Sequence, residues 1–120
     1  MKRFIELKHV GPKAQVRGLI EDLSGRLEDR LRHFPEEAVS LHVVFEENGA
    51  HTLYRTAVTC HVPGHTVAAH EESRQAGTTI REAFAEIERQ LDKLNAVIRQ
   101  DYLRRRSAKT RRVRAPARDV

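Results

Sequence analysis

VSLHVVFEENGAHTLYRTAVTCHVPGHTVAA, residues 39–69, contains three short β-prone segments separated by two turn signals. Asn48-Gly49 favours a tight hairpin, because both residues tolerate positive φ, and Pro63-Gly64 favours a second turn. Three consecutive strands with short turns predict an antiparallel meander. The predicted strands are Val39 to Phe45, Leu53 to Cys60 and roughly Thr66 to Ala69.

A further strand and a helix precede this meander. Phe4 to His9 alternates like a short strand and meets Gly11-Pro12, which should end it. Apolar residues then recur every three or four positions, which predicts an amphipathic helix that Pro35 should end. Because this helical connection is long, the first strand can pair in parallel with the next one through a right-handed crossover. The apolar stripe is Val16, Leu19, Ile20, Leu23, Leu27, Leu31 and Phe34.

The last periodic block predicts a second helix of more than six turns. Thr79-Ile80-Arg81-Glu82 fits a capping box and predicts a start at Thr79, with a start near Ser73 as the alternative. The apolar face consists of Ile80, Ala83, Phe84, Ile87, Leu91, Leu94, Ile98 and Tyr102.

The predicted fold class is α+β, with the element order β-α-β-β-β-α. A two-layer sandwich is expected, in which a four-stranded, mostly antiparallel sheet carries two helices packed on one face. The domain should span residues 1–106. Residues 107–120 are rich in Ala, Pro and Arg without an apolar period, so they are predicted to form a basic, disordered tail.

Composition narrows the class of protein. A chain of 120 residues, 32% charged and 39% hydrophobic, is about one domain long. It contains neither an apolar run of the length of a membrane span nor an apolar leader, so a cytoplasmic protein without a membrane partner is predicted. The single cysteine, Cys60, excludes an internal disulfide and a multi-cysteine metal site within one chain.

The net charge of +5 is unevenly distributed. From Arg99 to the end there are nine basic and two acidic residues, a local charge of +7, so the rest of the chain carries −2. A nearly neutral body with a basic end is typical of a nucleic-acid-binding arm. An arm that docks on anionic lipid and a merely solvating tail are the alternatives.

Several strings resemble the ribosome hibernation promoting factor family, also called ribosome-associated inhibitors or sigma-54 modulation proteins. VTCHVPG at 58–64 and VAAHEE at 67–72 are similar to the family's strand, Pro-Gly turn and short strand with an acidic end. IERQLDKL at 87–94 resembles the signature of its second helix. The likeness covers roughly residues 3–106. It departs from the family at Gln75-Ala76-Gly77, where Asp-Met-Tyr is usual, and at Glu86, where a lysine is common.

The resemblance implies a protein that binds rRNA of the small ribosomal subunit and sterically blocks mRNA and tRNA, suppressing translation in stress while protecting idle ribosomes. Arg89 and Lys93 match basic family residues that face rRNA. The chain resembles a short form without the additional C-terminal dimerisation domain. No cofactor and no small-molecule substrate are implied.

The candidate RNA-binding residues combine the two matched positions with the basic end of the chain, because arginines can both grip phosphate and stack on bases. Glu82 and Glu86 lie on the same helical face as Arg89, and this spacing also fits ordinary ion pairs within the helix. The predicted set is Arg89, Lys93, Arg99, Arg104, Arg105, Arg106, Lys109, Arg111, Arg112 and Arg114.

Other chemistry is disfavoured. His61, His65 and His70 lack a third ligand at a recognisable spacing, so exposed strand histidines are preferred over a metal site. Cys60 and His61 should point to opposite sides of a strand, so Cys60 is predicted to be a core residue and not a nucleophile. No catalytic motif is present, and an enzyme is not expected. The alternatives are a general module for structured RNA and a protein-interaction adaptor that uses an exposed sheet edge.

Overall fold

In a computed structural model, the chain has the order β1 (Lys2–Lys8), α1 (Ala14–Arg30), a 3₁₀ turn (Glu36–Ala38), β2 (Ser40–Asn48), β3 (Leu53–Val62), β4 (His65–Ser73) and α2 (Ala76–Asp119). The structure describes residues 1–8, 14–48 and 53–119, and side chains 101, 102 and 105–119 lie outside that description. The predicted α+β class and the predicted order of elements are confirmed.

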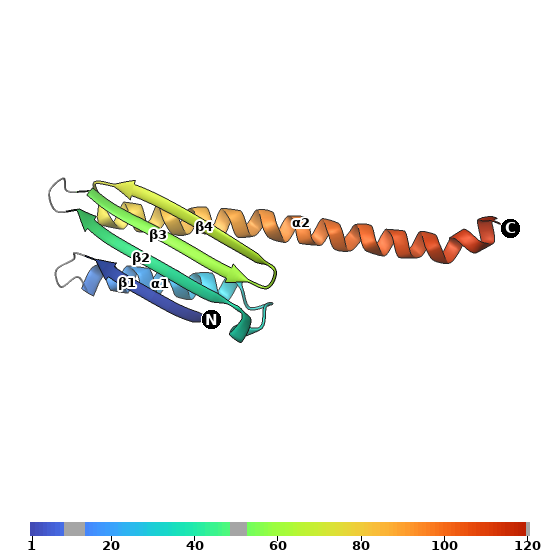
Figure 1. The fold of residues 1–120 in the computed structure, drawn as a ribbon, viewed down its shortest axis with the longest axis horizontal. Helices are drawn as coiled ribbons and strands as arrows, with labels where there is room; N and C mark the ends of the chain where they lie inside the picture. Colours follow the sequence, from blue (N-terminus) through green and yellow to red (C-terminus); the bar gives the residue numbers. More distant parts are fainter. Residues whose placement is uncertain (9–13, 49–52, 120) are drawn as a thin grey trace. The chain divides into compact units, whose positions relative to one another are not determined.

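The four strands form one mixed sheet in the order β1-β2-β3-β4 (Figure 1). β1 pairs in parallel with β2, as the long helical connection predicts, while β3 and β4 add antiparallel strands. Leu41 lies opposite Arg3 on one side and Cys60 on the other, so each register row places its side chains on one face of the sheet.

The core lies between one sheet face and the two helices, α1 and the first part of α2, which cover it (Figure 1). Alternation along β2 buries every second residue, and the positions between them face away from the helices. The fully buried sheet residues include Leu41, Val43, Phe45, Val58 and Cys60, and the fully buried helix residues include Ile20, Leu27, Ile80, Ala83 and Ile87.

The predicted Pro63-Gly64 turn is confirmed, and Gly64 has the positive φ of 79° that such a turn requires. The Asn48-Gly49 turn was expected between β2 and β3, but residues 49–52 lie outside the described part of the chain. β4 is longer than predicted because its polar end still pairs with β3, and there Glu72 forms an ion pair with Arg55. An edge strand can carry such polar residues, which conceal the alternating pattern.

The first helix is shorter than its apolar stripe predicts. α1 ends at Arg30, and the chain then tightens through backbone bonds from Leu31 N–H to the Glu28 carbonyl and from Phe34 N–H to the Leu31 carbonyl. Such i to i−3 bonds commonly close the last turn of a helix. Leu31 is nevertheless buried, so an apolar period can continue beyond the regular helix.

The predicted capping box at the start of the second helix is wrong. α2 begins at Ala76, and the Thr79 N–H already donates to the Gln75 carbonyl, as it does inside a helix. The Thr79 hydroxyl is fully buried and donates to the Glu71 carbonyl at 2.9 Å. Thr79 therefore ties the helix to β4 instead of capping it.

The chain divides into two compact units, Met1–Arg89 and Gln90–Val120. The domain boundary expected at residue 106 stays a prediction. α2 runs on to Asp119, and the disorder expected of residues 107–120 in the free protein stays a prediction. The Arg, Lys and Ala residues of this segment favour a helix, whereas Pro116 within it opposes one. Within the described residues, no helix combines the length and the apolar content of a membrane span.

Candidate nucleic-acid interface

The predicted RNA-binding residues all lie on α2 but are shared between the two units. Lys93, Arg99 and Arg104 belong to the second unit and are exposed. Lys93 and Arg104 are eleven positions apart, close to three full turns, so they share one face of the helix. For the remaining basic residues the structure gives the helical backbone only, and these are Arg105, Arg106, Lys109, Arg111, Arg112 and Arg114.

Arg89 is exposed, but its guanidinium is already engaged with the Glu86 carboxylate one turn earlier. Both residues line a shallow hollow of about 330 Å³ together with Glu71 and Glu82. An RNA phosphate at this position would meet three carboxylates, so it would have to compete with them for the cation. The ion pair that the sequence spacing indicated is present, and it lowers the contribution expected of Arg89.

Ion pairs engage several other arginines of the first unit. Exposed pairs of this kind contribute little to stability, but each cancels the field of its cation at the surface. These pairs include Arg3–Glu28 at 3.3 Å, Arg30–Glu88 at 3.8 Å, Arg32–Asp29 at 2.9 Å and Arg55–Glu72 at 2.5 Å.

The Arg30–Glu88 pair shows where α1 and α2 meet. It joins the last residue of α1 to a residue three turns into α2, both within the first unit. Because residues one or two turns apart share a helix face, this contact identifies the other side chains along the same line. We call this line between the helices the helix seam.

Two exposed arginines lie on the helix seam and were not among the predicted residues. Arg26 is one turn before Arg30, and Arg81 is two turns before Glu88. Neither forms an ion pair with any described residue. The guanidinium of Arg81 folds back over Gly77, where an added Cβ would come within 2.9 Å of its Nη1 atom. Gly77, a departure from the family pattern, thus makes room for Arg81.

Neither arginine belongs to a basic cluster along the chain, so the sequence does not single them out. The signal present in the sequence is that both lie on polar faces of amphipathic helices. Their proximity to one seam, however, depends on how two helices 50 residues apart in sequence pack, which no local pattern contains.

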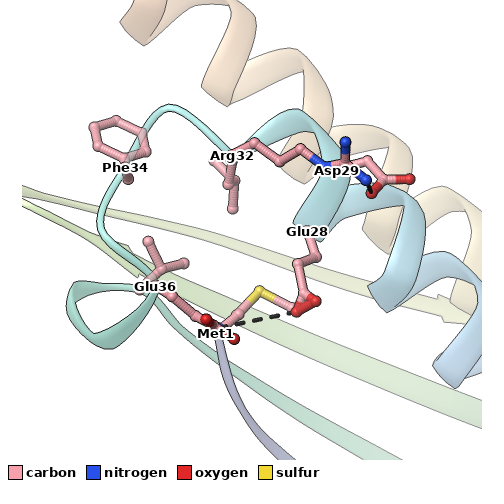
Figure 2. A pocket seen from close by; sticks show the side chains of 8 residues that line it. Met1, Glu28, Asp29, Arg32, Phe34 and Glu36 are labelled. Atoms are coloured by element: carbon pink, nitrogen blue, oxygen red, sulfur yellow. Dashed lines mark hydrogen bonds and ion pairs between the residues drawn. The ribbon is translucent and has the colours of Figure 1, made fainter.

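A second hollow, of about 280 Å³, lies near the end of α1 (Figure 2). The Met1 amino group lies there 3.5 Å from Glu36 and 3.9 Å from Glu28. Asp29 and Arg32 also line it. With three carboxylates around it, this hollow suits a cation and not a phosphate.

The histidines of the sheet do not converge. His61 and Thr66 share a hydrogen bond of 3.0 Å between Nδ1 and Oγ1 across β3 and β4. No three metal-ligating side chains gather among the residues that the structure describes. Cys60 is completely buried, which confirms its prediction as a core residue.

Burial raises the pKa of the Cys60 thiol from 9.0 to about 11. The neutral thiol is therefore favoured in the folded chain, and its contribution to stability is complete below pH 9 and is lost as the pH rises through about 11. We expect this loss to reach about 2 kcal/mol. Urea unfolding between pH 8 and 11 should show it in the parent chain and not in Cys60→Ala. Equal pH dependence of the two chains would contradict the assignment.

The parallel strand followed by a three-stranded meander, with both helices on one face, defines a class of small α+β proteins. Residues 4–99 match the family described as "Sigma 54 modulation protein / S30EA ribosomal protein". This match covers most of the chain, which therefore belongs to that family, and the resemblance of its motifs is confirmed. Membership indicates a ribosome-associated protein.

Two solved structures share the fold. A ribosomal subunit interface protein from Coxiella burnetii has a TM-score of 0.61 at 21% identity, covering 80% of this chain and 99% of that one. The N-terminal domain of Protein Y from Thermus thermophilus has a TM-score of 0.63 at 19% identity, covering 78% and 99%. No curated protein sequence matches the chain.

Proposed function

We propose that this protein is a translation inhibitor that binds rRNA of the small ribosomal subunit and sterically blocks mRNA and tRNA. Family membership supports the ribosome as partner, and the name of one structural neighbour, a ribosomal subunit interface protein, points to the interface between subunits. The observation that carries the proposal is the pair of exposed arginines at the helix seam, Arg26 and Arg81, which form no ion pair with the described residues and so are available to phosphates.

The mechanism is occupancy. A bound protein that fills the path of mRNA and tRNA prevents initiation without making or breaking a covalent bond, and it leaves the ribosome intact for later use. The inhibitor therefore needs affinity, shape and the correct site, and it needs no catalytic group.

The two units divide the work. Nine basic residues from Arg99 onward supply long-range attraction, because counterions released from RNA favour binding at any sequence. In the first unit, ion pairs engage five of the nine arginines, so this unit contributes position more than affinity. Lys93 and Arg104, which share one face of α2, bind RNA phosphates together with the basic residues that follow them.

Sedimentation of the full chain with purified small subunits tests the proposal directly. The protein should co-migrate with the small subunit, and excess tRNA plus mRNA should displace it. Equal binding to any RNA duplex of the same length would instead support a general module for structured RNA. Binding that is insensitive to salt and to RNA removal would support a protein-interaction adaptor. Either result would overturn the proposal.

The helix seam can be tested with a charge-matched pair of variants. Arg26→Gln with Arg81→Gln should weaken binding to the small subunit about tenfold and reduce the salt slope by about 2, one for each lost phosphate contact. Affinity is measured by fluorescence anisotropy of labelled protein at several salt concentrations.

The control for that variant is Arg17→Gln with Arg74→Gln. Arg17 and Arg74 are also exposed, and neither forms an ion pair with a described residue. Arg17 is nine positions from Arg26, which places the two on opposite sides of α1. Both variants lose two charges, so equal effects would show that total charge, and not the helix seam, determines the affinity.

A further inference from the structure

The sheet face turned away from the helices is uncovered in the first unit. Its central rows run across all four strands, and the first of them consists of Phe4, His42, Thr59 and Ala68. The sequence neighbours of His42 show the orientation of this row. Leu41 and Val43 are fully buried, and successive strand residues point to opposite faces, so His42 and its row face away from the helices. We call this surface the open sheet face.

Phe4 is the unusual residue on the open sheet face. From the sequence alone, the four phenylalanines, Phe4 among them, fit core or edge positions better than a base-stacking platform. The structure exposes 56% of Phe4, although burial of such a ring would be favourable. Its ring centroid lies 6.0 Å from that of His42, with 46° between the ring planes. A tilted neighbour of this kind supports one side of the phenyl ring and leaves a face of it uncovered.

The side chains that continue the row of this ring pair are small. Thr59 and Ala68 continue the row, and Ala57 lies in the next row beside Val44. Lys2 and Glu6 lie two residues to either side of Phe4 on the same face of β1, and both are exposed, so the cation is on the Lys2 side of the ring. Thr59 and Ala68 are small enough to leave room for a planar ligand beside the ring. Lys2 supplies a cation two residues away from Phe4 along β1.

The side chains of the open sheet face suit a single nucleobase better than a protein partner. Among the described residues of the first unit, Phe4 is the one large apolar side chain that is mostly exposed. A stable protein interface needs a contiguous apolar core within roughly 800 Å² on each partner, and one phenyl ring does not supply it. Stacking of a single base needs only an aromatic face and a cation for the adjacent phosphate.

We propose that Phe4 and His42 form a stacking site for one unpaired nucleobase of single-stranded RNA, with Lys2 at its phosphate. This site lies on the opposite side of the sheet from the helix seam, so it goes beyond the steric block proposed above. The partner is recognised by the flat face of a base, and the site accepts any base sequence.

The chain contains no tryptophan, which makes a direct measurement possible. In the Phe4→Trp variant, the new indole is the only one, and a stacked base should quench its fluorescence. The full-length variant is titrated with an eight-nucleotide oligoadenylate and with an abasic oligomer of the same length and charge. Oligoadenylate should quench by more than half at saturation, and the abasic oligomer should leave the emission nearly unchanged.

Two further variants make the result specific. Leu103→Trp places a reporter on an exposed residue of the second unit, beside Arg104, and it should show no difference between the two oligomers. Adding His42→Ala to Phe4→Trp should weaken the base-dependent quenching several-fold. Equal responses of Phe4→Trp to both oligomers, or no response, would overturn the stacking site. Because this titration contains no ribosome, its outcome is separate from that of the sedimentation test.

Discussion

A chain that ends at residue 103 is expected to bind the small ribosomal subunit about two to three orders of magnitude more weakly than the full chain. The truncation removes eight of the nine basic residues after position 98. If about half of them contact phosphates, their counterions contribute roughly 1 kcal/mol each at moderate salt. The slope of log affinity against log salt should therefore fall by about 3.

Charge and chain length can be separated in this experiment. A second variant keeps residues 104–120 and replaces only their Arg and Lys residues with Gln, which preserves length and helix propensity. It should lose as much affinity as the truncation. Unchanged affinity and salt slope in both variants would show that the basic end does not bind rRNA, and the proposed division between the two units would be wrong.

Replacing Phe45 with Ala should reduce the free energy of unfolding by about 3–5 kcal/mol, the largest stability effect expected for a single substitution here. Phe45 is completely buried in β2, and its ring stacks on Tyr54 at 5.8 Å between centroids. Since small domains are stable by about 5–15 kcal/mol, this loss is a large part of the total. Urea unfolding at pH 7 measures it.

The control lies three residues earlier in the same strand. His42 faces the open side of the sheet and is exposed, so His42→Ala should change the free energy of unfolding by less than about 0.5 kcal/mol. The contrast tests the alternation of β2 itself. A cost below 1 kcal/mol for Phe45→Ala, or similar costs for both variants, would contradict the assignment of the two sheet faces.

The fold was largely predictable because its signals are local. Alternation in residues 39–69, the Pro63-Gly64 turn and the two apolar stripes determine the order of elements and the face of the sheet that is buried. Errors arose where tertiary contacts override a local signal. Thr79 has the sequence of a cap, but its hydroxyl bonds to the Glu71 carbonyl because the helix starts earlier and packs on β4.

The candidate interface was less predictable. The link between Arg89 and Glu86 follows from helical spacing, and it is present. The helix seam depends instead on the Arg30–Glu88 contact between two helices. The exposure of Phe4 depends on the register of β1 with β2, which places Phe4 beside His42 on the open sheet face. Both are consequences of three-dimensional packing, so a pattern search along one chain does not find them.

The ion pairs on the first unit have a consequence for how relatives should be compared. Ion pairs with acidic side chains engage five of the nine exposed arginines of the first unit. The attraction that this surface exerts on a polyanion is therefore regulated by its glutamates and aspartates, each acting as an internal counterion. Two homologues with identical basic residues can differ in affinity if one of them has lost an acid, so acidic positions are as informative as basic ones.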